Sequence, residues 1–297
     1  RDLHRVDRRQ RQMCIRDSFY IDTQAPPPPA NLQADPDGWT RQNQFALFWG
    51  NPGDPAGIAG AYYKIGAAPT ANEDGTWVGG DELTWIPNIS VAGDGAHVAY
   101  VWLKDKLGHV DYTRHATATL RYDGTAPEAP LNLTPTPDSW TNLNLFILSW
   151  TNPGEPSGIV GAYYRRYTAP THPTDGTFVA GQNLQTIANL NVAGDGAHPV
   201  YVWLRNGVGD ADHTRAATAT LRYDSTAPTL PAVFTSTTHV TGTWTTNNVV
   251  TVTWSAATDA LSGVGGYALT RDQNPVSYTH LRAHETPEHL VCRLLLE

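Results

Sequence analysis

The residues of this sequence with the clearest chemical potential are an aspartate and a histidine that occur together twice. Asp94 stands three residues before His97, and Asp195 stands three residues before His198. A carboxylate beside an imidazole can form a general acid–base pair. The glycine that follows each aspartate favours a turn instead, in which the aspartate hydrogen-bonds to nearby backbone. We favour the turn and expect no catalytic residue, because no serine or cysteine nucleophile recurs beside the pair.

Acidic loop residues repeat in the same way and offer oxygen ligands for a metal ion. The candidates are Asp94, Asp195, Asp111 and Asp212. Calcium takes about six to eight oxygen atoms, which several loops of one domain can supply together. No loop shows the dense alternation of Asp and Asn that makes a calcium site recognisable. Solvated loop charge is the simpler interpretation, structural calcium is the alternative, and no other cofactor is expected.

Tryptophans at turns are candidates for ligand binding. Trp39 and Trp140 each lie between a polar loop and a threonine, and Trp244 lies in a similar place. An exposed indole is flat and apolar with a polar tip, so it can stack on a sugar ring. A tryptophan here can equally cap the end of a core, and we favour that role. Four other tryptophans lie in alternating strand patterns and are assigned to packing: Trp49, Trp102, Trp150 and Trp203.

All these candidates belong to a long internal repeat. The motifs DTQAP, DGTAP and DSTAP begin at Asp22, Asp123 and Asp224, with a spacing of 101 residues each time. Residues 22–122 and 123–223 agree without a gap at 57 of 101 positions. A third copy runs from Asp224 to about residue 275. A unit of this length suits a complete β-sandwich domain rather than a solenoid repeat.

The second copy predicts about seven strands separated by turn signals. Residues 199–205 (PVYVWLR) give the strongest pattern, with Val200, Val202 and Leu204 on one face, because strand side chains alternate. The full set of predicted strands is 131–133, 145–150, 161–167, 177–179, 185–192, 199–205 and 217–223. The fold class is therefore all-β, a tandem array of two-sheet β-sandwiches of which the last is truncated.

The truncated copy has room for about three strands of the seven that a sandwich needs. We expect the strand at residues 249–254 (VVTVTW) to lack partners and to expose an edge that is prone to association.

Several marks of one copy resemble fibronectin type III and bacterial immunoglobulin-like modules. They are a proline-rich start followed by Asn132-Leu133, Trp150 at the end of the second strand, Tyr163 and Tyr164 in the third, and the run from Tyr201 to Trp203. The DxTAP opening resembles the joints of bacterial surface-protein arrays. The resemblance implies stalks, adhesins or accessory modules of secreted hydrolases.

Both ends of the chain resemble translated sequencing-adapter DNA. Residues 13–18 (MCIRDS) match one adapter end, and residues 276–286 (VSYTHLRAHET) match the opposite one. We set residues 1–18 and 276–297 aside as adapter-derived. The alternatives are a basic nucleic-acid-binding arm and a histidine-rich metal tail. The expected domains are 19–123, 124–224 and the truncated 225–275.

Composition excludes several classes of function. The net charge is −8, and residues 19–275 are more acidic still, which argues against binding to nucleic acid. Both cysteines (Cys14, Cys292) and the one methionine (Met13) lie in the adapter-like ends, so no disulfide is expected between the copies and the sequence is expected to be an internal fragment. No apolar run approaches the length of a membrane span.

These observations predict a non-catalytic spacer array of an extracellular or cell-surface bacterial protein, made of monomeric beads that present or link other domains. The alternative is a set of adhesion modules that bind a cell-surface or extracellular glycan or protein, with Trp39 and Trp140 as the ligand residues.

Overall fold

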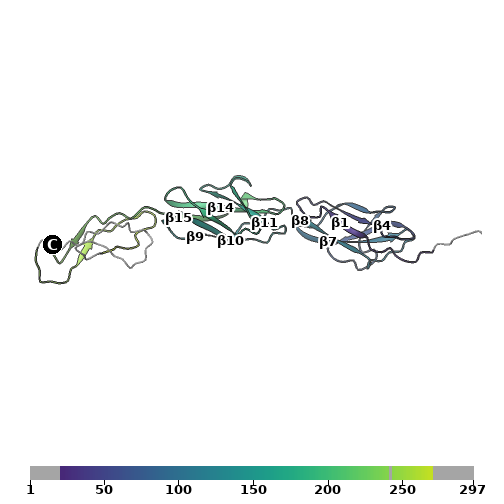
Figure 1. Cartoon of the computed structure of the whole chain (residues 1–297), viewed down its shortest axis with the longest axis horizontal. Helices are drawn as coiled ribbons and strands as arrows, with labels where there is room; N and C mark the ends of the chain where they lie inside the picture. The colour runs from purple at the N-terminus through teal and green to yellow at the C-terminus, as the bar shows by residue number, and fades with distance from the viewer. Residues whose placement is uncertain (1–20, 241–242, 270–297) are drawn as a thin grey trace, which may run out of the picture. The chain divides into compact units, whose positions relative to one another are not determined.

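The computed structural model describes residues 21–240 and 243–269 (Figure 1). The adapter-like stretches, residues 1–18 and 276–297, lie outside the described residues, as do residues 270–275 of the third copy. The chain divides into two compact units: Arg1–Tyr122, called unit 1 here, and Asp123–Glu297, called unit 2. The division falls next to the aspartate of the second DxTAP motif. The separate status of residues 225–275 stays a prediction.

Unit 1 is a sandwich of two sheets. Its three-stranded sheet has the order β1-β3-β6, and its five-stranded sheet has the order β2-β8-β7-β4-β5. The parallel pairing of β2 with β8 is the exception to antiparallel pairing in this unit. The strands are β1 (Ala30–Asp35), β2 (Trp39–Thr40), β3 (Phe45–Gly50), β4 (Ile58–Ile65), β5 (Thr76–Gly79), β6 (Trp85–Ile89), β7 (Gly95–Asp105) and β8 (Ala116–Tyr122).

Unit 2 repeats this arrangement with the sheets β13-β10-β9 and β12-β11-β14-β15. A bridge from Thr141 to Tyr223 is parallel, as is the pairing of β2 with β8. Helical structure in the described residues is limited to the 3-10 turn η1 (His213–Arg215). The strands are β9 (Leu131–Thr136), β10 (Phe146–Thr151), β11 (Ile159–Arg166), β12 (Thr177–Ala180), β13 (Thr186–Leu190), β14 (Gly196–Asn206) and β15 (Ala217–Tyr223).

Each unit has its own hydrophobic core, because alternate strand side chains point between the sheets. In β10 the buried side chains are Phe146, Leu148 and Trp150, while their neighbours face outward. In β14 Val200, Val202 and Leu204 join the same core, as the sequence pattern predicts. Unit 1 has a separate core of equivalent residues. The prediction of tandem β-sandwiches is confirmed. Within residues 21–240 and 243–269, no helix is long and apolar enough to cross a bilayer.

A second buried layer lies on the outer face of the larger sheet. Trp102 and Trp203 have no exposed surface, although their strand neighbours on both sides fill the inter-sheet core. The loop before β5 covers Trp102 and accepts a hydrogen bond of 2.8 Å from its indole nitrogen at the carbonyl of Asn72. Gly75 comes so close that a Cβ would lie 2.5 Å from the indole. The packing role predicted for these tryptophans is confirmed, against a loop rather than against the opposite sheet.

An asparagine holds the loop before β7 in place in unit 1, and its counterpart does so before β14 in unit 2. The side-chain oxygen of Asn43 accepts the backbone N–H of Val91, and its amide donates to the carbonyl of the same residue, both at 2.8 Å. Asn144 makes the same two bonds with Val192, also at 2.8 Å. One side chain thereby satisfies both backbone groups of a residue that no strand partner reaches.

The third copy contributes a short hairpin to unit 2. β16 (Phe234–Ser236) pairs antiparallel with β17 (Val252–Trp254). The strand at 249–254 was expected to lack partners. This expectation is wrong, because one edge of the strand pairs with β16. The threonine-rich segments are able to form one ladder because β-branched residues suit a pleated surface. In the described residues the second edge of β17 has no strand partner.

Candidate functional site at the DxTAP end of each unit

The DxTAP motif, which reads DTQAP in unit 1, opens a segment that is docked on its own unit. We call residues 22–29 and 123–130 the joint segments. Two prolines of each are buried: Pro26 and Pro29 in unit 1, and their counterparts Pro127 and Pro130 in unit 2. Proline fixes its own backbone angle, so a docked segment rich in proline has little freedom to lose.

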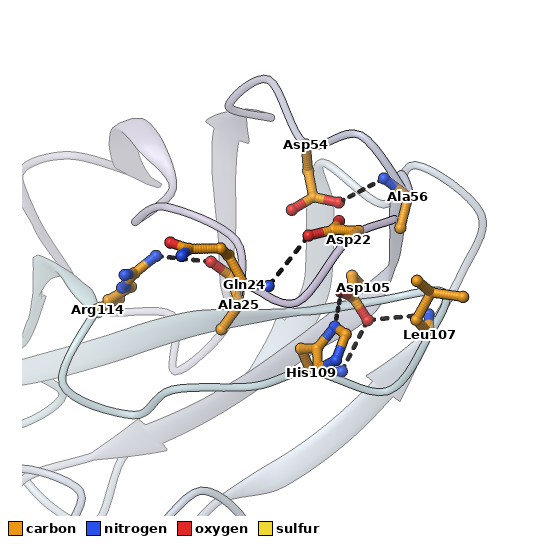
Figure 2. A network of polar contacts seen from close by, with 9 residues as sticks. All are labelled: Asp22, Gln24, Ala25, Asp54, Ala56, Asp105, Leu107, His109 and Arg114. Atoms are coloured by element: carbon orange, nitrogen blue, oxygen red, sulfur yellow. Dashed lines mark hydrogen bonds and ion pairs between the residues drawn. The ribbon is translucent and has the colours of Figure 1, made fainter. Parts of the chain in front are cut away.

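An arginine holds each joint segment through a main-chain carbonyl. Arg114 Nη1 donates to the carbonyl of Ala25 at 2.7 Å, across 89 residues of sequence (Figure 2). Arg215 makes the same bond to Ala126, also at 2.7 Å. A guanidinium presents several donors in a rigid fork, so it can hold a carbonyl and a carboxylate together. The role of these arginines was not predicted, although both recur at the repeat spacing.

Two of the aspartates proposed as calcium ligands orient these arginines. Asp111 Oδ2 lies 3.4 Å from Arg114 Nε, and Asp212 Oδ2 lies 3.6 Å from Arg215 Nε. Each aspartate also accepts hydrogen bonds from the N–H and hydroxyl of the threonine two residues on. The bond from the threonine hydroxyl is the largest cause that lowers the pKa of both carboxyls. Their oxygens are therefore occupied by protein donors.

Asp195 binds the start of the third copy. Its Oδ1 accepts the backbone N–H and the hydroxyl of Ser225, each at 2.8 Å, and its Oδ2 accepts the hydroxyl of Thr226 at 2.6 Å. The Thr226 hydroxyl is the first cause that lowers the pKa of this carboxyl. Asp94 occupies the same turn in unit 1. The hydrogen-bond partners of Asp195 therefore differ from those of the arginine-linked Asp212.

Each histidine of the recurring Asp–His pair contacts a backbone carbonyl of the turn that precedes it. His97 Nε2 lies 3.0 Å from the carbonyl of Gly93, and His198 Nε2 lies 2.9 Å from that of Gly194. In unit 2 no hydrogen bond or ion pair joins Asp195 to His198, both of which are described. This geometry favours the turn over an acid–base pair.

The carboxylates that do converge were not predicted. Within residues 21–240 and 243–269, the group of three potential metal ligands is Asp22, Asp105 and His109, whose ligand atoms all lie within 4.8 Å of one another. Burial would raise the pKa of Asp105, but hydrogen bonds from the side chain and backbone of His109 outweigh burial and lower it. Asp54 faces the same region, and its pKa is raised by burial first and then by repulsion from Asp22 and Asp105.

Trp39 and Trp140, the two ligand candidates of the sequence, are half-buried. Trp244 is 98% exposed. A more exposed aromatic pair lies on unit 1: Phe48 of β3 and Trp85 of β6 stand opposite one another in register, with ring centroids 6.2 Å apart and an interplanar angle of 20°. Sequence reasoning missed this pair because Phe48 lies in an apolar run in which the outward-facing residue cannot be recognised by type.

The fold and the docked joint segments define a serial array of β-sandwich modules of the immunoglobulin and fibronectin type III class. No family model matches the chain, and no curated protein matches it. Among solved structures, the chicken CNTN1 FN1–FN3 domains are similar over 67% of this chain and 69% of that chain, at 16% identity and a TM-score of 0.29. At that TM-score the likeness adds nothing to the assignment, which rests on strand order and on the two separate cores.

Proposed function

We propose that this chain is part of a non-catalytic spacer in an extracellular or cell-surface bacterial protein, built from β-sandwich beads whose joints are stiffened by docking. The observation that carries the proposal is the arginine–carbonyl bond, made at the same length in both units. A flexible linker needs no such contact, whereas a spacer that keeps its reach requires each joint to resist bending.

The joint segment of unit 2 has further anchors that support a stiff joint. Asp123 has no exposed surface, and its Oδ2 accepts the hydroxyl of Ser157 and an amide N–H of Asn206. Arg215 also forms an ion pair with Glu128 of the segment, at 3.0 Å. Residues 123–130 are thus held by side chains from three separate parts of the bead.

The stiffness of the joint can be measured with spin labels, one on each unit, in the full chain. We expect a narrow distribution of label distances that broadens in Arg215→Ala. Arg222→Ala is the matched control, because Arg222 also donates to a main-chain carbonyl, that of Asp138, but away from the joint segment. Equal distributions for the protein and for Arg215→Ala would count against a docked, stiff joint.

Glycan capture is a second candidate function, favoured by the Phe48–Trp85 pair. Trp85 is 48% exposed and Phe48 41% exposed, and near-parallel rings of this kind offer a flat apolar platform to a sugar. Unit 2 has Ser149 and Thr186 at the same positions, so it has no platform there. Binding on a glycan array that disappears in Phe48→Ser/Trp85→Thr would establish this role; binding that survives would remove it.

A further inference from the structure

The two units differ at one position in the same turn at the DxTAP end. Position 105 of unit 1 corresponds to position 206 of unit 2, and the residues there are Asp and Asn. In both units a side-chain oxygen accepts a backbone N–H four residues on, from His109 or from Asp210, at 2.7 Å. The turn is therefore the same in both units. The units differ in the second polar atom of this side chain, which is a carboxylate oxygen in unit 1 and an amide nitrogen in unit 2.

In unit 2 that second atom is a hydrogen-bond donor surrounded by oxygens. Asn206 Nδ2 lies 3.0 Å from the carbonyl of Thr125, 3.2 Å from Asp123 Oδ2 and 3.3 Å from Glu155 Oε1. The amide N–H groups thus join the joint segment to the loop before β11. Asn206 has no exposed surface, so this neutral link is enclosed.

In unit 1 the second atom is a carboxylate oxygen, and the donor is lost. Asp105 is 1% exposed, and its Oδ2 lies 2.7 Å from His109 Nδ1. Asp22 and Asp54 stand where unit 2 has Asp123 and Glu155. Figure 2 shows Asp22 between Asp54 and the Asp105–His109 pair. Three carboxylates therefore meet without the amide that joins them in unit 2.

A buried oxygen in this group has no partner. Asp22 Oδ1 accepts the backbone N–H of Gln24 at 3.0 Å, while Asp22 Oδ2 is buried without a hydrogen bond. Asp123 of unit 2 also has one buried oxygen without a partner, Oδ1, but its Oδ2 accepts the Ser157 hydroxyl and an Asn206 amide N–H. An unpartnered buried carboxylate oxygen is costly, and a cation removes that cost. The neighbouring lysine of the turn does not supply the charge, because Lys106 is paired with Asp81 at 2.6 Å and with Glu82 at 3.3 Å.

We infer that Asp22, Asp105 and His109, with Asp54 beside them, form a binding site for a divalent transition-metal ion of the zinc type in unit 1, and that unit 2 lacks this site. The ligand atoms lie within 4.8 Å of one another, a span that a single ion can bridge after a small contraction, given metal–ligand bonds of about 2.0–2.2 Å. An imidazole nitrogen among carboxylates suits zinc, whereas calcium takes oxygen ligands alone.

The matched variant is Asp105→Asn, which places in unit 1 the residue that unit 2 carries. In EDTA we expect this variant of the full chain to fold, because unit 2 makes the same turn with Asn206. With excess Zn²⁺ we expect the Tm of unit 1 to rise by at least about 5 °C in the unchanged protein and not in the variant. Calorimetric titration with Zn²⁺ should show one bound ion fewer in Asp105→Asn; any sites among the ten other histidines and the two cysteines cancel in this difference.

A second variant, His109→Gln, tests whether His109 acts as a metal ligand or only as a hydrogen-bond donor to Asp105. Glutamine keeps a donor for Asp105 but has no imidazole nitrogen, so we expect it to fold and to lose the response to Zn²⁺. The proposal is overturned if Zn²⁺ stabilises the protein and Asp105→Asn equally, if His109→Gln keeps the response, or if Ca²⁺ stabilises unit 1 and Zn²⁺ does not. None of these outcomes bears on the spacer function, which is tested by the joint distances.

Discussion

Trp203 lies parallel to the ring of Tyr163, with centroids 5.5 Å apart and an interplanar angle of 12°. Trp102 and Tyr62 repeat the arrangement in unit 1 at 5.6 Å and 12°. In each unit the indole nitrogen donates to a loop carbonyl, that of Pro173 at 2.7 Å in unit 2. A loop thereby covers the outer face of the larger sheet. Without this loop, the stacked tryptophan and tyrosine rings would be exposed to water.

The first prediction concerns this seal. Trp203→Ala should lower the free energy of unfolding of unit 2 by about 3–5 kcal/mol, because the indole is fully buried and its removal leaves a cavity. Urea unfolding measures the change. Trp244→Ala is the control, since Trp244 is almost wholly exposed and should leave the midpoint unchanged. A loss below about 1 kcal/mol in Trp203→Ala would contradict the buried stack.

The asparagine that holds the loop before β14 gives a second prediction. Asn144→Asp keeps the oxygen that accepts the Val192 N–H but places a second oxygen against the Val192 carbonyl. We expect unit 2 to be destabilised by about 1–3 kcal/mol at neutral pH, with part of the loss recovered on acidification as the carboxyl gains a proton. Thermal unfolding at pH 7 and pH 4 measures both effects; a loss that does not depend on pH would contradict the paired geometry.

The third prediction concerns acid stability. Asp74 Oδ2 accepts the Lys64 ammonium, the Thr70 N–H and the Thr70 hydroxyl, each at 2.8 Å. The bond from Lys64 is the largest cause that lowers the pKa of Asp74 from 3.8 to about 2. A lowered pKa means that the stabilisation is present above the ordinary value and is lost as the pH falls from about 4 to about 2.

The test compares the protein with Asp74→Asn across pH. The variant should have the lower Tm of unit 1 at neutral pH, and the gap should close between about pH 4 and pH 2. Asp37→Asn, an exposed aspartate of the same unit, controls for the change in net charge. A gap that stays constant down to pH 2 would show that Asp74 is not held as a carboxylate by Lys64.

The fourth prediction concerns the third copy. Removing residues 225–297 deletes the β16–β17 hairpin and the bonds of Asp195 to Ser225 and Thr226, all near the surface. We expect unit 2 to lose no more than about 1 kcal/mol, because hydrogen bonds at exposed positions contribute little. Removing residues 217–297 should unfold unit 2, since β15 pairs with β14 along its length. Hydrogen exchange of the β14 amides distinguishes the two deletions.

Much of the fold could be predicted from the sequence because strand alternation and turn residues act locally. Residues 145–150 and 199–205 were placed within a few positions of β10 and β14. The two-residue strand β2 was not predicted, because its parallel pairing with β8 depends on residues far away in the sequence. The covered position of Trp102 was missed for the same reason: a loop that folds back leaves no periodic pattern.

The candidate site was harder to predict, because its residues come from three separate segments. Asp22 was recognised as a repeat marker, and Asp105 and His109 were not singled out at all. The informative signal was the difference between copies, Asp105 against Asn206, rather than their likeness. The four proposed calcium ligands stay a prediction; the structure gives Asp111, Asp195 and Asp212 donors from the protein.

The anchoring of residues 123–130 by Arg215, Ser157 and Asn206 has a genetic consequence. These anchoring residues belong to the domain that follows the joint segment. A gene divided just before each DxTAP aspartate therefore keeps each joint segment with the domain that holds it. A gene of this kind can lengthen or shorten its product by whole beads without exposing a half-built domain.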